Sequence, residues 1–265
     1  METRLSTPHI ERRISMEYIA GFVIAVIIAL TGVGAGTITA PLLILFLRVP
    51  AGIAVGTALS YSALVKLIVV PAQIIRRQVN YRILAFMLAG GLPGVVLGAQ
   101  LFVHVAHRGN WAALYWVLGG IVIFSSAFHI FHYFHSSSAG PSRKERLRWV
   151  TALMLPIGAE VGFSSSGAGA LGTVALLSLT SLPASQVVGT DLAFGLGVAL
   201  VGSGIHILGG TYSALLLIRM AAGGVVGAIV GSNIAPRVPN KQLRLVISSC
   251  LLLIGLVFCY RAATF

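Results

Sequence analysis

Two carboxyl side chains lie inside apolar stretches of this chain of 265 residues, where a charged group is costly and therefore requires an explanation. The sequence holds only six acidic residues, and four of them fall in a polar N-terminal stretch or a central polar linker. The other two are Glu160 and Asp191. Because removal from water disfavours a charged carboxylate, both are candidates for proton coupling. The alternative is structural pairing with Lys66 and Arg219, the two cations inside apolar stretches.

Two glycine-rich interruptions with neighbouring hydroxyls form a second candidate site. A helix broken at membrane depth survives only where protein or a watery cavity satisfies its free backbone groups. The half-helix that follows presents free N–H groups and a positive dipole end, which suits an anion. Hydroxyls beside the break can donate to that anion without adding charge. The predicted substrate-binding residues are Gly34, Ala35, Gly36, Thr37, Thr57, Ser164, Ser165, Ser166, Gly167, Ala168, Gly169 and Thr190.

Each of these features also has a purely structural explanation. Glycines allow helices to pack closely, which is the expectation for the small-residue runs at 90–98 and 223–231. Serine and threonine hydroxyls in membrane helices often bond to their own backbone, and Ser164–Ser166 could do so. A lone apolar-segment histidine, His206, is expected to be a hydrogen-bonded packing residue rather than a ligand.

An offset of 133 residues superimposes the two interruptions and reveals an internal duplication. Without a gap, residues 34–59 align with 167–192, and ten of the 26 positions are identical. The alignment keeps a Gly-Thr pair in both halves, whereas neither Glu160 nor Asp191 has an acidic counterpart. Paired helix breaks at matching points of two repeats indicate the binding site of a transporter.

Composition excludes a soluble domain, because 57% of the residues are hydrophobic and only 9% are charged. The formal net charge is +12, but the cations cluster between apolar runs as orientation signals do, so nucleic acid is not an expected partner. No catalytic or nucleotide-binding motif is present, which predicts a non-enzyme without cofactor or metal. His129, His132 and His135 lie among aromatic residues at the end of an apolar run and indicate an interfacial belt.

The expected fold is an all-α polytopic membrane protein with about eight transmembrane segments in two homologous four-segment repeats, the first segment of each being broken at its glycine-rich motif. The expected divisions are an N-terminal tail (1–17), a first membrane repeat (18–135), a basic cytoplasmic linker (136–148) and a second membrane repeat (149–265). If each broken segment crosses the membrane once, the two sides hold 11 and five Lys/Arg. If each is re-entrant, the repeats are inverted and the sides hold ten and six. Eight conventional crossings are the preferred alternative.

The motif residues resemble the sulfite exporter TauE/SafE family of membrane anion permeases. The stretch from Leu30 to Leu43, followed by Pro50 and by Ala54-Val-Gly-Thr-Ala-Leu59, is similar to the first repeat motif of that family. The second copy, Gly162 to Leu192, is similar to the second motif. The resemblance covers essentially the whole chain. It implies a multi-pass permease of the bacterial inner membrane for small sulfur-containing or organic anions such as sulfite or sulfonates.

Two functions from different classes stay open at this point. The first is a secondary transporter that binds a small anion at the paired breaks, with protons as a coupling ion; an anion channel is a variant of it. The second is a non-transporting membrane scaffold, assembly factor or sensor that uses the basic linker and tail as a docking surface. Because a scaffold needs no half-helix N-termini at membrane depth, the breaks favour the transporter. The expected partners are the small anion, protons and the lipid bilayer, and a homo-oligomer is compatible with the sequence.

Overall fold

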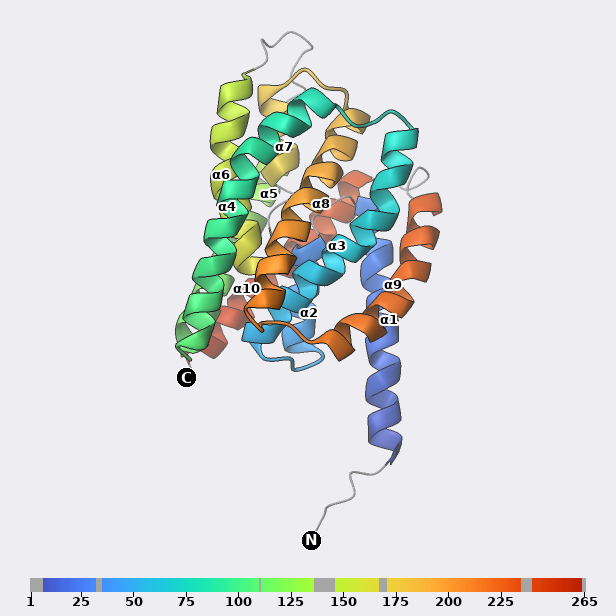
Figure 1. Cartoon of the computed structure of the whole chain (residues 1–265), viewed down its shortest axis with the longest axis vertical. Coiled ribbons are helices and arrows are strands. Elements are labelled where there is room, and N and C mark those ends of the chain that lie inside the picture. Colours follow the sequence, from blue (N-terminus) through green and yellow to red (C-terminus); the bar gives the residue numbers. More distant parts are fainter. Residues whose placement is uncertain are drawn as a thin grey trace.

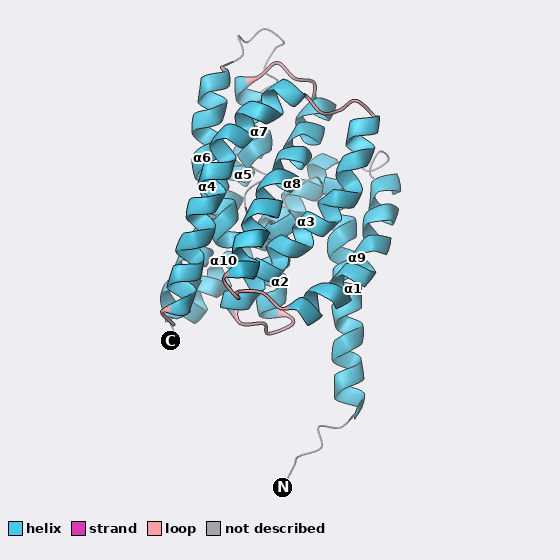
Figure 2. Ribbon diagram, in the orientation of Figure 1, coloured by secondary structure: helices cyan, strands magenta, loops and turns pink. Residues whose placement is uncertain are grey.

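Ten helices make up the described chain (Figure 1). The sequence of long and short helices in the first five is repeated in the second five. The computed structural model describes residues 7–31, 35–109, 111–135, 146–166, 171–234 and 240–263. Within these ranges, the side chains outside the description are those of 7–14, 31, 35–38, 111–113, 128, 129, 132–135, 240–248, 251, 261 and 262. No strand occurs in the described ranges, so the all-helical expectation is confirmed for them (Figure 2).

Each half places a short helix second and follows it with three long ones. The first half contains α1 (Thr7–Thr31), α2 (Ala35–Leu45), α3 (Ala51–Ile75), α4 (Tyr81–His107) and α5 (Trp111–His135). The second half contains α6 (Leu147–Ser164), α7 (Leu171–Leu179), α8 (Ala184–Leu208), α9 (Ala214–Ile234) and α10 (Asn240–Ala263). Because α1 begins at Thr7, the described part of the expected tail continues the first apolar segment as one helix.

The expected interruption of the first segment is present in both halves. The helix before it ends at Thr31 in one half and at Ser164 in the other. The short helices that follow have 11 and nine residues. At 1.5 Å per residue they are about 16 and 14 Å long, roughly half of a bilayer core. The next long helices start directly after Pro50 and Pro183, which are equivalent positions and cannot continue a preceding helix.

The helices of the two halves are interleaved, and equivalent helices of the two halves make equivalent contacts. Helix α1 packs along α9 of the other half, and its counterpart α6 packs along α4. Helices α3 and α8, which are counterparts, pack on each other, as do α5 and α10. Exchanging each helix for its counterpart therefore maps the main contacts onto themselves, which is the property of a pseudo-twofold axis.

Glycines bring the interleaved helices into backbone contact. A Cβ atom on Gly90 would collide with the carbonyl oxygen of Thr151, and one on Gly94 would collide with that of Leu155. The counterparts behave alike: Gly223 and Gly227 of α9 face the carbonyl oxygens of Tyr18 and Phe22 in α1. The prediction that the runs at 90–98 and 223–231 are close-packing faces is confirmed.

Helix directions show how each broken segment runs. The contacts of α1 with α9 follow the same order along both helices, from Tyr18 with Gly223 to Phe22 with Gly227, so the two helices are parallel. A hydrogen bond joins the loop before α9 to the first turns of α3, so α9 and α3 begin at one end of the molecule. Hence α1 begins at the same end of the molecule at which α2 ends and α3 begins. We call this the lower end, after its place in Figure 1.

The second half repeats this arrangement upside down. Helix α6 is parallel to α4, as the contacts from Thr151 with Gly90 to Ala159 with Gly98 show. The loop before α4 is bonded to the first turns of α8, so α4, α6 and α8 all begin at the opposite, upper end (Figure 1). Each broken segment thus begins and ends at one end of the molecule. The preference for eight conventional crossings differs from this course, which is that of the re-entrant alternative with inverted repeats. The physical reason is the shortness of α2 and α7, which are too short to complete a crossing.

Four described helices are long and apolar enough to span a membrane by length and composition. They are α3, α4, α8 and α9. Shorter apolar stretches of helix occur at Ser15–Leu30 in α1 and Leu114–Ala127 in α5. Helices α3 and α8 pack on each other at the centre, with α9 against α3 and α4 against α8, and α3 is the most buried of the four. The short helices α2 and α7 contact α3 and α8, respectively.

Candidate functional site

The serine run lies at the end of α6, where the second broken segment stops being helical. All three side chains of Ser164–Ser166 are buried. The hydroxyl of Ser164 donates to the carbonyl oxygen of Glu160, 2.9 Å away in its own helix. Ser165 has a left-handed backbone (φ +59°) that ends α6, and its N–H donates to the carbonyl oxygen of Val161. Backbone bonding therefore accounts for one serine hydroxyl.

Ser166 is different, because its hydroxyl oxygen is buried without a hydrogen-bond partner among the described residues. Its backbone N–H donates to the hydroxyl of Ser164 at 3.2 Å. A buried polar atom without a partner is costly and asks for an explanation such as an absent ligand or water. Of the predicted hydroxyls, Ser166 is the one that the described structure leaves available.

The glycines of the two breaks are only partly described. Gly34 and Gly167–Gly169 lie outside the described residues, and so does the conformation predicted for them. In the first half, Ala35, Gly36 and Thr37 form the first turn of α2, although their side chains are outside the description. Helix α2 contacts α6, the helix that carries the serine run. Thr39 and Ala40 in the second turn of α2 are buried, as are Gly172 and Thr173 in the first turn of α7, so both short helices begin near the protein interior.

Thr57 and Thr190 form matching hydrogen bonds between the halves, and we call these contacts the two clasps. The hydroxyl of Thr57 accepts the backbone N–H of Ser213 at 2.9 Å, and it also donates to the carbonyl oxygen of Ile53. The hydroxyl of Thr190 accepts the backbone N–H of Asn80, also at 2.9 Å. Ser213 and Asn80 are again 133 residues apart. The threonines lie at opposite ends of the molecule, and any substrate contact would have to be added to these bonds.

The glycine before each threonine completes its clasp. A Cβ atom on Gly56 would collide with the carbonyl oxygen of Thr211, and one on Gly189 would collide with that of Gln78. The loop that precedes α9 or α4 therefore lies directly on the helix of the other half. Sequence reasoning missed this role, although the repeated Gly-Thr pair was its signal.

The intramembrane charges do not pair as one set. The carboxylate of Asp191 accepts the hydroxyl of Thr173 at 2.9 Å, and it interacts electrostatically with Lys66. Arg219 instead bonds to Glu17 at 2.9 Å. The interaction of Asp191 with Lys66 is one that the structural alternative predicts, while Arg219 is paired with an acid that the sequence analysis had assigned to the tail.

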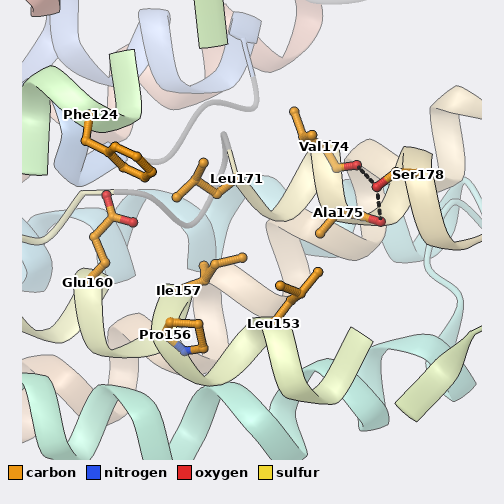
Figure 3. Close-up of a pocket in the computed structure, with 9 residues that line it drawn as sticks. All are labelled: Phe124, Leu153, Pro156, Ile157, Glu160, Leu171, Val174, Ala175 and Ser178. Carbon is orange, nitrogen blue, oxygen red and sulfur yellow. Dashed lines mark hydrogen bonds between the residues drawn. The ribbon is translucent and has the colours of Figure 1, made fainter. Parts of the chain in front are cut away.

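Glu160 lines a cavity of about 290 Å³ between α5, α6 and α7 (Figure 3). One oxygen of its carboxyl group, Oε1, is buried without a hydrogen-bond partner among the described residues. The rest of the lining is apolar apart from one hydroxyl: Phe124, Leu153, Pro156, Ile157, Leu171, Val174, Ala175 and Ser178. Ser178 is itself bonded to the backbone of α7 (Figure 3). Glu160 is therefore the sole titratable group among the lining residues.

The first half has other apolar side chains at the equivalent positions of its first two helices. Its residues at the positions of Glu160, Ala175 and Ser178 are Ile27, Leu42 and Leu45. Ile27 and Leu42 pack against Val122 of α5, whereas the counterpart of the cavity would be bordered by α10. The second half instead has small residues of α7 and a carboxyl group at these positions, and they line the cavity. Both changes belong to the second half alone.

His206 is a packing residue, as its sequence context predicts. It is fully buried, and its Nδ1 and Nε2 lie 2.9 Å from the hydroxyl of Thr211 and the carbonyl oxygen of Gly162. Its ring packs edge-on against Phe102. The side chains of His129, His132 and His135 lie outside the described residues.

Comparison with known proteins identifies one family and one similar protein. Residues 18–258 match the family described as Sulfite exporter TauE/SafE. The chain is 27% identical over 244 residues to the Probable membrane transporter protein YjnA of Bacillus subtilis (strain 168), covering 89% of this chain and 96% of that protein. No solved structure matches the chain.

Proposed function

The chain belongs to the sulfite exporter TauE/SafE family of membrane transporters, and from this premise we propose that it is a secondary transporter of small oxyanions such as sulfite or sulfonates. The proposed binding site lies between the two helix breaks. It comprises the N-terminal turns of α2 and α7, the glycine motifs Gly34–Gly36 and Gly167–Gly169, and the serine run at the end of α6.

The observation that carries this proposal is the pair of re-entrant segments with short inner helices. Both α2 and α7 have buried residues within their first two turns, and the first N–H groups of a helix have no helical partner and lie at the positive end of its dipole. The unpartnered hydroxyl of Ser166 lies just before the second short helix and supplies a further donor. A site built from N–H groups and hydroxyls suits an oxyanion, because it offers several donors to a compact negative group.

Inverted repeats supply a route to alternating access. The arrangement of one half is repeated upside down in the other, so a conformation open to one side has a symmetry-related conformation open to the other side. By connectivity, ten of the Lys/Arg outside the apolar stretches belong to the upper end, against six to the lower end, and four of those six are in the two terminal segments. By the positive-inside rule, the upper end faces the cytoplasm and the N-terminus faces the outside. The proposed location is the inner membrane of a bacterial cell.

Glu160 is the proposed proton-binding residue. Protonation would remove its negative charge from the neighbourhood of the second break and so favour the binding of an anion. An anion that leaves a negative cytoplasm gains about 2.3 kcal/mol per charge at 100 mV, so export needs no coupled ion. Import against that potential does need one, and Glu160 is placed to supply it.

Transport in reconstituted vesicles tests the proposal. Labelled sulfite and a panel of small sulfonates and carboxylates should enter or leave vesicles that hold the protein, at rates above those of empty vesicles, with and without a pH gradient. If no small anion moves, the chain is better described as a membrane scaffold.

A further inference from the structure

Lys66 is buried at the contact between α3 and α8, with 3% of its surface exposed. Its ammonium group lies against the α8 backbone at Gly195, where a Cβ atom would stand in its place. Asp191 lies one helical turn before Gly195 on α8, and its carboxylate interacts electrostatically with Lys66. A buried ammonium group needs such a counter-charge, because leaving it unpaired costs several kcal/mol.

The same carboxylate also contacts the first turn of α7. Its Oδ2 atom accepts the hydroxyl of Thr173 at 2.9 Å, and its Oδ1 atom lies where a Cβ on Gly172 would be. Asp191 therefore lies between a buried cation on α3 and the beginning of a re-entrant short helix. This position is where the proposed function requires a substrate anion to lie.

The duplication shows that the fold does not need this pair. The counterpart of Asp191 in the first half is Ala58, and the counterpart of Lys66 in the second half is Ala199. Both alanines are fully buried. Each half has thus placed one charge at a position that the other half fills with a methyl group, and the two charges meet across the α3–α8 contact.

We infer that Lys66 is the substrate-binding cation and that Asp191 is its built-in competitor, which a substrate oxyanion replaces. The inference rests on the proposed function and identifies the substrate class of that site. Sulfite, sulfonate and carboxylate groups all present two oxygens that match those of Asp191. One would accept the hydroxyl of Thr173, and the other would face Gly172. Asp191 stays buried on α8 when the anion displaces it, so its carboxylate takes up a proton from water, and the charges of Lys66 and the anion then cancel.

Displacement would also release α7. The bond between Thr173 and Asp191 ties this re-entrant helix to α8. A substrate that takes over the hydroxyl of Thr173 and the charge of Lys66 leaves Asp191 without both contacts. Occupancy of the site is thereby linked to the position of α7 relative to α8.

The test measures anion binding to the purified full chain in detergent, with sulfite and methanesulfonate as the probes. Binding is read from the rise in Tm with anion concentration, since a ligand of the folded state stabilises it. Asp191→Ala, which copies the first half, should bind both anions on the order of tenfold more tightly, because a competing charge has been removed. Lys66→Ala should lose the response, and the double variant should fold and stay unresponsive. Ser203→Ala, which removes a buried polar group from α8 three turns beyond Asp191, is the matched control and should resemble the unchanged protein.

Two results would overturn the inference. The first is a folded Asp191→Ala or Asp191→Asn protein whose anion response is unchanged or weaker. The second is failure of both variants to fold even with sulfite present, because displacement requires a stable fold without the carboxylate beside Lys66. Vesicle transport separates this inference from the proposed function. If no anion moves but Asp191→Ala binds anions more tightly, the transport function fails and the anion site stands.

Discussion

The hydroxyl oxygen of Thr57 accepts the backbone N–H of Ser213 at 2.9 Å, across 156 residues of chain. The equivalent bond, from Asn80 to Thr190, closes the opposite end of the molecule. Each bond holds the first turns of a central helix against the loop that starts a long helix of the other half. The duplicated sequence thereby ties its two halves together twice.

Replacing either threonine by valine should destabilise the protein without changing its shape. Thr57→Val leaves the half-buried N–H of Ser213 without its acceptor, which costs about 1 kcal/mol. Thr190→Val should cost a similar amount through Asn80. The measurement is the Tm of each variant in detergent, and Thr57→Ser, which keeps the acceptor, is the control. Equal melting of the valine and serine variants would show that the clasp contributes nothing.

Anion binding to the same variants tests whether the threonines also touch substrate. Both remain predicted substrate-binding residues, and each hydroxyl already accepts a backbone N–H in its clasp, while that of Thr57 also donates to the carbonyl oxygen of Ile53. If the prediction holds, the folded fraction of each valine variant binds the anion more weakly than the native protein does. Unchanged affinity in the folded fraction would restrict Thr57 and Thr190 to the structural role.

Gly94→Ala should be among the most damaging single substitutions in α4. Its Cβ would enter the backbone of α6 at Leu155 and Ala159, so the interleaved helices would have to separate. Overpacking of this kind costs about 1–3 kcal/mol, and backbone contact places it at the upper end. Gly120→Ala is the matched control, because no atom lies within 4 Å of the new Cβ. Folded yield and Tm that are equal for the two variants would contradict the packing.

Glu160→Gln should remove the pH dependence of anion transport. Lowering the pH protonates Glu160 in the native protein, so anion affinity should rise as the pH falls. Glutamine is neutral at every pH and should hold the affinity at its acidic value. No other lining residue of the cavity is titratable. An unaltered pH profile in reconstituted vesicles would make Glu160 a structural group and the protein a uniporter.

The cavity around Glu160 should also admit a lipophilic carboxyl reagent from the membrane. Phe124 and Leu153, which line it, have 66% and 42% of their surfaces exposed, so the cavity lies beneath a surface of the protein. Dicyclohexylcarbodiimide should modify Glu160, as peptide mass spectrometry can detect. Ala175→Leu with Ser178→Leu copies Leu42 and Leu45 of the first half and should prevent the labelling. Labelling that is insensitive to these substitutions would place the reagent elsewhere.

The duplication made the helix order and the glycine faces predictable, because an offset of 133 residues relates both. Whether the broken segments cross the membrane or re-enter was not predictable. The two sides of the membrane would hold 11 and five Lys/Arg in the first topology and ten and six in the second, which is too small a difference to decide. Contacts across the halves were also hidden. Nothing local in the sequence joins Arg219 to Glu17, 202 residues away, or Thr57 to Ser213. The positions of polar residues in apolar stretches indicated a candidate site. Which side chains bond to each other depends on how the two halves interleave.

Exchange of labelled sulfite across vesicles is the most direct test of the central claim that the helix breaks bind and move a small oxyanion. The native protein should exchange internal for external sulfite, and Ser166→Val, which removes the unpartnered hydroxyl at the second break, should exchange it at least about tenfold more slowly, as loss of one hydrogen bond to an anion predicts. Ser203→Val, whose buried hydroxyl is bonded to its own helix, should exchange sulfite at the native rate. Native-rate exchange by a folded Ser166→Val protein would contradict the assignment of the breaks as the anion site.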